Sequence, residues 1–161
     1  MKFGATVKFV RPQFVSEGGP VDKVMGPDEA SRIYMRDIVS RPEYDKEVEQ
    51  FSCLYLDVRN QCKAAAIISK GIANMSLVHA REVFRPAIAC GASTVVLLHN
   101  HPTGDTSPSP ADLKVTRDLV QSGKILDIKV MDHIVMNDGE LFMGQSSRFL
   151  SMRESGLVSF A

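Results

Sequence analysis

The chain has 161 residues, of which 44% are apolar, so it is long enough for one domain with a substantial core. Nineteen basic and nineteen acidic side chains cancel, which excludes a basic surplus over the whole chain for binding phosphate backbones and leaves only a local basic patch open. The three cysteines form no CxxC pair, residues 1–14 show neither the apolar region nor the cleavage site expected of a signal peptide, and no apolar stretch approaches the roughly 20 residues of a membrane span. We therefore expect a cytoplasmic protein with reduced cysteines and no membrane anchor.

The first elements predicted along the chain are an extended arm and a helix. Residues 1–26 are rich in Gly, Pro and charge, so we predict an arm with a short strand over 5–10 and a compact domain over 27–161. Pro27, followed by two acidic residues, predicts the start of a helix that Pro42 ends.

The middle of the chain predicts a hairpin and a second helix. Residues 51–58 and 61–69 are typical of two paired strands, and Gly71 ends the pair. Between residues 76 and 90 apolar side chains recur at helical spacing, and Gly91 lies where a glycine commonly ends a helix.

The last third predicts a strand, a third helix and a further strand. Residues 94–98 are apolar or β-branched, which indicates a strand buried on both faces. A helix is predicted over 110–121 and ends because Gly123 breaks it; a strand follows over 125–136, and Asp138–Gly139 forms a turn. The element order predicts an α/β fold, a single domain in which helices sandwich one mixed β-sheet.

Two histidines follow the buried strand in the segment LLHNHPTGDTSPSPAD. Residues two apart on an extended segment point to the same side, so His99 and His101 are expected to converge on one point. A hydrogen-bonded pair in the core is the simpler alternative, but two imidazoles beside a carboxylate favour a metal such as zinc.

Asp112 is the best candidate for a third ligand. The proline-containing loop over 102–108 is short, so it should return the first turn of the next helix to the strand end, where open α/β sheets build their sites. Ser109, Pro110 and Asp112 also match the N-cap, N1 and N3 positions of a capping box, which would need no metal. Both interpretations stay open from the sequence.

Two other families with related patterns fit less well. HNH nucleases distribute their three residues over a ββα unit instead of placing them side by side. Zinc deaminases carry His-x-Glu and Pro-Cys-x-x-Cys, whereas position 101 is histidine and the chain has no CxxC.

The spacing of these residues resembles the JAMM (MPN-type) metallopeptidases, whose motif is His-x-His, seven residues, Ser, two residues and Asp. His99, His101, Ser109 and Asp112 match it without a gap, and VHAREVFRPAI, HNHPTGDTSPSPAD and MDHIVM resemble the bacterial RadC branch. The resemblance covers about residues 28–158 and implies a cytidine-deaminase-like architecture. It also implies one zinc ion held by His99, His101 and Asp112, with Ser109 stabilising an oxyanion.

The resemblance further implies a glutamate general base near the first strand of the sheet. Glu47 and Glu49 both lie there and share one parity along an extended segment, so only the closer approach of Glu49 to the core favours it. Glu82 is a weaker candidate because it lies among arginines in a predicted helix. His133 lies in an apolar strand, where we expect a hydrogen-bonded structural histidine near Asp132 and not a ligand.

Two functions follow from these expectations. The first is a zinc metallohydrolase that cleaves an amide bond of an unidentified peptide or protein substrate by activating water. The alternative is a RadC-type accessory protein of DNA repair or anti-restriction with a structural or vestigial metal. Long RadC proteins carry an N-terminal helix-hairpin-helix segment. In its place this sequence predicts only the arm and one helix, so we expect weak DNA association. A homodimer is compatible with the sequence.

Overall fold

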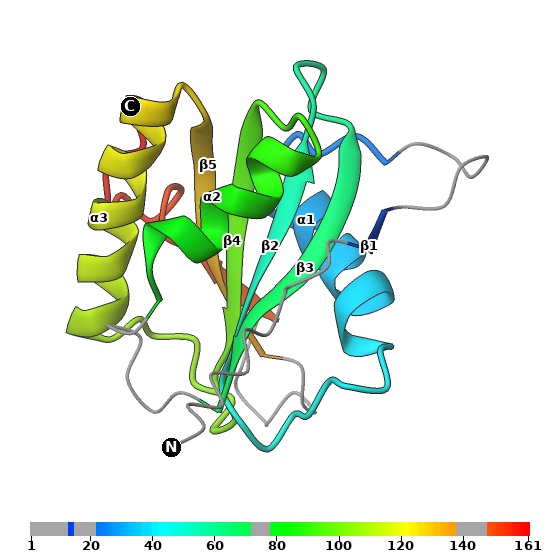
Figure 1. Ribbon diagram of the computed structural model, residues 1–161. Helices are drawn as coiled ribbons and strands as arrows, with labels where there is room; N and C mark the ends of the chain where they lie inside the picture. Colours follow the sequence, from blue (N-terminus) through cyan, green and yellow to red (C-terminus); the bar gives the residue numbers. More distant parts are fainter. Residues whose placement is uncertain (1–12, 15–21, 72–77, 138–147) are drawn as a thin grey trace, which may run out of the picture.

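The structure is a computed structural model that describes residues 13–14, 22–71, 78–137 and 148–161. It is built on one mixed sheet whose strands lie in the order β1-β3-β2-β4-β5-β6. The strands are β1 (Gln13–Phe14), β2 (Gln50–Leu56), β3 (Cys62–Lys70), β4 (Thr94–Asn100), β5 (Lys129–Met136) and β6 (Phe149–Ser151). Among the described strands, β4 and β5 are the one parallel pair of neighbours, and the other pairs are antiparallel (Figure 1).

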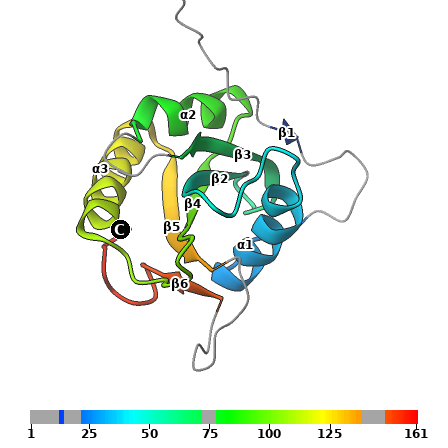
Figure 2. The ribbon, with the colours of Figure 1, turned by 90° about the horizontal axis from the view of Figure 1, so that it is seen from below.

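Helices cover both faces of this sheet. They are α1 (Pro27–Tyr34), continued by the π-helical turn η1 (Met35–Val39), α2 (Ala80–Ala89) and α3 (Pro110–Leu126). Seen from below, α2 and α3 lie on one face and α1 on the other (Figure 2). The predicted α/β class, one mixed sheet between helices, is confirmed. Among the described residues, no helix combines the length and the apolar character that crossing a membrane would require.

Strand β4 lies inside the sheet, between β2 and β5, and all seven of its residues are buried. Its alternating side chains divide between two cores, as the period of a strand requires. Val95 and Leu97 pack into the core beneath α2 and α3, whereas Val96 and Leu98 pack into the core beneath α1. The predicted strand buried on both faces is therefore confirmed, and it extends two residues further, through His99 to Asn100.

Several predicted elements are confirmed with shifted ends. The hairpin of 51–58 and 61–69 is β2 with β3, and the turn between them includes Asn60 at a φ of 61°. The first helix reaches Val39 by way of η1, and α2 ends at Ala89, just before Gly91 at a φ of 63°. The start of the predicted second helix at 76–77 lies outside the described residues.

The prediction that Gly123 breaks the third helix was wrong. Helix α3 continues to Leu126 and ends at Asp127, whose φ of 54° is left-handed, while the N–H of Ile128 donates to the carbonyl oxygen of Gly123. Residues 125–126 therefore belong to the helix and not to the following strand, which begins at Lys129. The glycine does not break the helix; it allows Ile128 and Phe84 to pack closely against the helix at this position.

The segment before α1 already packs on the domain. The N–H of Cys62 donates to the carbonyl oxygen of Asp22, the N–H of Val24 donates to that of Asn60, and Val24 is completely buried. The strand predicted over 5–10 and the turn predicted at 138–139 lie outside the described residues.

Replacing Gly123 with alanine is expected to destabilise the protein, although alanine favours an ordinary helix by about 1 kcal/mol. A Cβ at this position would collide with the carbonyl oxygen of Ile128 and lie 3.3 Å from the ring of Phe84. We expect Gly123→Ala to lower the free energy of unfolding by about 1–3 kcal/mol in urea denaturation. Lys124→Ala, an exposed change on the same helix, should stay within about 0.5 kcal/mol of the parent. An alanine variant as stable as the parent would contradict the close packing.

Candidate metal centre

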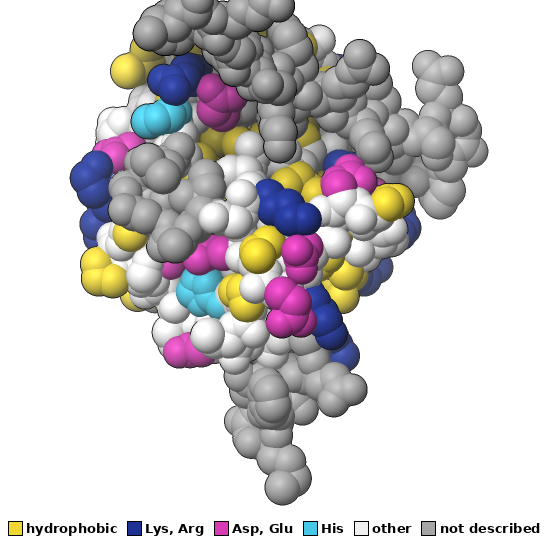
Figure 3. Space-filling model, turned by 60° about the horizontal axis from the view of Figure 1, so that its bottom comes forward, with side chains coloured by type: hydrophobic (Ala, Val, Ile, Leu, Met, Phe, Trp, Pro, Cys, Tyr) yellow, Lys and Arg dark blue, Asp and Glu magenta, His cyan; other side chains and the backbone are white. Residues whose placement is uncertain are grey.

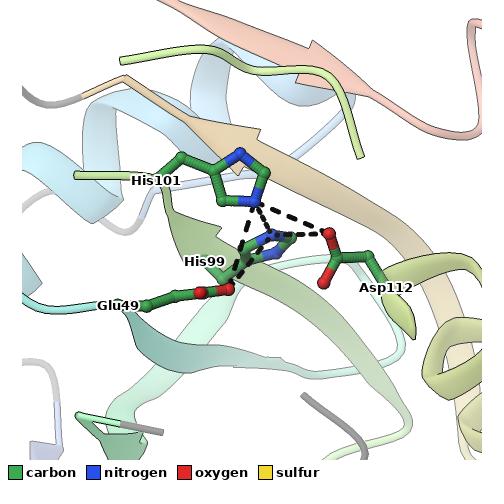
Figure 4. Close-up of side chains that lie close together, drawn as sticks. All are labelled: Glu49, His99, His101 and Asp112. Carbon is green, nitrogen blue, oxygen red and sulfur yellow. Dashed lines mark hydrogen bonds and ion pairs between the residues drawn. The ribbon is translucent and has the colours of Figure 1, made fainter. Parts of the chain in front are cut away.

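The end of β4 delivers the first two side chains of the site. His99 is in the strand and completely buried, and His101 follows the strand with its side chain 16% exposed. Their Nε2 atoms lie 2.9 Å apart, so the expected convergence of the two rings is observed (Figure 4). The Nδ1 atom of His101 is 2.6 Å from the carbonyl oxygen of Asp105. Because a carbonyl oxygen only accepts, Nδ1 of neutral His101 carries the proton and Nε2 keeps a free lone pair.

Asp112 enters from the first turn of α3 and has two structural roles. The N–H of Ser109 donates to Asp112 Oδ2 at 2.7 Å, and the N–H of Asp112 donates to Ser109 Oγ at 3.1 Å. This is the capping box that the spacing predicts, and it does not exclude a second role for the carboxylate. The same Oδ2 atom lies 3.6 Å from His99 Nε2 and 3.5 Å from His101 Nε2. The capping box is therefore the device that places the carboxylate beside the imidazoles.

Glu49 completes the group from the residue that precedes β2. Its Oε1 atom lies 3.9 Å from His99 Nε2 and 4.0 Å from His101 Nε2, and its side chain is 23% exposed. Glu47, by contrast, is an exposed residue outside the group, and Glu82 forms ion pairs with neighbouring arginines on α2. Of the three glutamates considered, only Glu49 reaches the histidines.

Asn100, the residue between the two histidines, holds the Glu49 backbone in place. Its Oδ1 accepts from the N–H of Gln50 at 2.9 Å, and its Nδ2 donates to the carbonyl oxygen of Val48 at 3.2 Å. The buried side-chain amide thus bridges the residues on either side of Glu49. Sequence reasoning missed this role, since the contacts join residues about fifty positions apart, and only the unusual HNH triplet marked the position.

Two further buried residues, His133 and Thr116, lie on the Nδ1 side of the His99 ring, away from the other three residues of the site. The Nδ1 atom of His99 lies 2.8 Å from His133 Nε2, and His133 Nδ1 lies 2.5 Å from Thr116 Oγ1. The expected hydrogen-bonded His133 is therefore found, but its ring contacts His99 and Thr116; the Asp132 carboxylate accepts from the backbone N–H instead. The sequence analysis did not identify the contact of Thr116 with His133, although Thr116 lies four residues after Asp112 and therefore on the same helix face.

The four facing side chains fit a divalent metal ion. One donor atom from each of Glu49, His99, His101 and Asp112 lies within 4.8 Å of every other. A tetrahedral ion with bonds of about 2.0–2.1 Å separates its ligands by about 3.3 Å, which the spacings of 2.9, 3.5 and 3.6 Å among the histidines and Asp112 bracket. Asp112 Oδ1 is buried without a hydrogen-bond partner, a costly state that a cation would relieve.

The protein environment shifts the ionisation of these groups in different directions. Burial opposes the charge of Asp112, but contacts with His101 and His99 outweigh it and hold the pKa of this carboxyl below its ordinary value. For Glu49, burial outweighs the same histidines and raises the pKa. The contact with Asp112 raises the pKa of His101, while complete burial lowers the pKa of His133 and so favours its neutral ring. Asp112 is thus the more strongly ionised of the two carboxyls.

Comparison with known proteins covers most of the chain. The RadC-like JAB domain family matches residues 25–157. A UPF0758 protein of Caldanaerobacter subterraneus subsp. tengcongensis is 38% identical over 160 residues, which are 99% of this chain and 63% of that protein. The UPF0758 proteins of Geobacter sulfurreducens and Methanosarcina mazei are 44% and 41% identical over 114 residues, or 71% of this chain and 46% of each relative.

The chain therefore spans about half to two thirds of the length of these curated relatives. The predicted resemblance is confirmed by the family match, which begins two residues before α1, ends beyond β6 and includes all four residues of the candidate metal centre. On this evidence the chain belongs to the RadC-like JAB domain family.

Proposed function

We propose that this protein is a zinc-dependent hydrolase of peptide or isopeptide bonds, with one zinc ion per chain. The observation that carries the proposal is the meeting of two imidazole nitrogens and one carboxylate oxygen at the end of β4, with a second carboxylate beside them. His99, His101 and Asp112 would hold the zinc, because three N and O ligands with one open position are typical of a catalytic zinc site.

Zinc bound there supplies Lewis acidity, which lowers the pKa of water and polarises a carbonyl group. Glu49 Oε1 takes the proton as the water oxygen forms its bond to the carbonyl carbon, and gives it to the amide nitrogen as the C–N bond breaks. The raised pKa of Glu49 suits a group that both accepts and returns a proton. Asn100 keeps this carboxylate in position through the backbone on either side of it.

Ser109 is placed to donate a hydrogen bond while it caps α3. Its hydroxyl oxygen accepts from the N–H of Asp112, and its own proton, which the Asp112 carboxyl also accepts, would turn to a substrate acceptor that is bound beside it. An oxyanion on the substrate is such an acceptor, and a positioned donor stabilises its charge.

Two of the four residues of the site are partly accessible to solvent. His99 and Asp112 are buried, whereas the partly exposed His101 and Glu49 form the accessible edge. Figure 3 views this end of the molecule, where histidine and acidic side chains reach the surface together. We propose that a peptide or protein substrate approaches from this side. Nothing among the described residues specifically favours the alternative of a DNA-associated accessory protein, and the net charge of the chain is zero.

Metal analysis tests the ligand set. Protein purified without a histidine tag is expected to contain about one zinc per chain, measured by inductively coupled plasma spectrometry. His99→Ala, His101→Ala and Asp112→Ala should each lose most of it, whereas His79→Ala, a change at an exposed histidine outside the candidate metal centre, should retain it. Full zinc retention in all three ligand variants would exclude this site.

Glu49→Gln is expected to keep the zinc and lower turnover by about 10²–10⁴-fold, because the amide cannot take the proton. Turnover is measured on any member of a fluorogenic peptide library that the parent hydrolyses. Glu47→Gln is the matched control, since Glu47 lies outside the metal centre, and it should behave as the parent. Equal turnover of Glu49→Gln and the parent would remove Glu49 from the mechanism.

Variants of Ser109 separate its two roles. Ser109→Ala should cost about 0.5–2 kcal/mol of stability through the lost cap. It should also lower turnover by about 10²-fold through the lost donor. Ser109→Asp can still cap the helix, so it should keep the melting temperature and the zinc but lose turnover, because its charge repels an oxyanion. An aspartate variant as active as the parent would mean that Ser109 is only a cap.

A further inference from the structure

A buried chain of polar atoms runs from His99 back to α3. It passes from His99 Nδ1 to His133 Nε2 at 2.8 Å, then from His133 Nδ1 to Thr116 Oγ1 at 2.5 Å, and ends at the carbonyl oxygen of Asp112, 2.6 Å from Thr116 Oγ1. His99, His133 and Thr116 are all completely buried, so each depends on a partner within the protein for its hydrogen bonds.

The direction of every hydrogen bond in this chain follows from its last member. The Asp112 carbonyl oxygen can only accept, so Thr116 donates its single hydroxyl proton to that oxygen. Met152 Sδ, 3.5 Å from the same hydroxyl, is a much weaker acceptor and does not compete. Thr116 Oγ1 must then accept from His133 Nδ1, and the neutral His133 ring is left with an unprotonated Nε2. That atom accepts from His99 Nδ1.

We propose that Thr116 and His133 are positioning residues that fix the ring tautomer of His99, with the proton on Nδ1 and the lone pair of Nε2 facing Asp112 and His101. The inference rests on the proposed metal site. It assigns a function to His133 and Thr116 that neither the capping box nor the core requires. Helix α3 then supplies one ligand through Asp112 and sets the proton of another through Thr116, one turn later on the same face.

The inference also explains the electrostatics of the site. The carbonyl oxygen of Asp105 accepts the Nδ1 proton of neutral His101, so when both rings are neutral the two Nε2 atoms carry lone pairs only 2.9 Å apart. Asp112 Oδ2 adds a negative charge 3.5–3.6 Å from both. Three electron-rich atoms that face one another repel unless a cation lies between them. Thr116 and His133 therefore organise the site for a metal ion before it binds.

Zinc affinity measured by competition with a chromophoric chelator tests the role of Thr116. Thr116→Val keeps the shape and removes the hydroxyl, and it is expected to weaken zinc binding by about 10–100-fold, the usual effect of losing an outer-layer partner. Thr116→Ser restores the hydroxyl and should bind within a few-fold of the parent. Near-UV circular dichroism verifies that both variants fold. Thr116→Val binding zinc as tightly as the parent would overturn the proposal.

The tautomer itself is measured in the zinc-free parent by long-range ¹H–¹⁵N correlation spectra of the imidazole rings. We expect protonated Nδ1 in both His99 and His133, with His99 Nε2 unprotonated; a proton on His99 Nε2 would overturn the inference. This measurement needs neither a variant nor bound metal. A parent that binds no zinc would therefore remove the proposed function, while the spectra would still decide the tautomer.

Discussion

The carboxylate of Asp112 is the contact on which the rest of the site depends. It accepts the N–H of Ser109 and so closes the first turn of α3, while the same oxygen faces the two imidazoles at the end of β4. Asp112 Oδ2 thus contacts both the start of α3 and the histidines at the end of β4. Because the capping box fixes the side chain from its own backbone, the carboxylate is held in position at little further cost in conformational entropy.

Around this contact the fold collects polar groups that a protein core ordinarily avoids. Asp112, His99, His133 and Asn100 are all buried, and burying polar groups is unfavourable unless each finds a partner. Asn100 is satisfied by the backbone around Glu49, and His133 by its two ring contacts. Asp112 Oδ1, by contrast, is buried without a hydrogen-bond partner, a state that a bound cation would relieve. The polar residues at this end of the sheet therefore form one connected cluster that could hold a metal ion.

The sequence predicts the parts of this arrangement that depend on short spacing. His99 and His101 share a side because they are two apart on an extended segment, and Ser109 with Asp112 shows the pattern of a helix start. The buried run over 94–98 likewise predicts the central strand. The choice of Glu49 over Glu47 was weaker, since both share one parity and only the position of the β2 start separates them.

The rest could not be predicted because it depends on contacts between distant segments. Asn100 meets residues 48 and 50, and His133 meets His99, only once the strand order and register are known. Gly123 was misjudged for the same reason: it looks like a helix breaker until β5 is seen packed against it.

The measurement that tests the central claim most directly is a zinc-edge anomalous difference map from crystals of the zinc-loaded protein. We predict a single strong peak within bonding distance of His99 Nε2, His101 Nε2 and an Asp112 oxygen; a peak elsewhere, or none among these atoms, would contradict it.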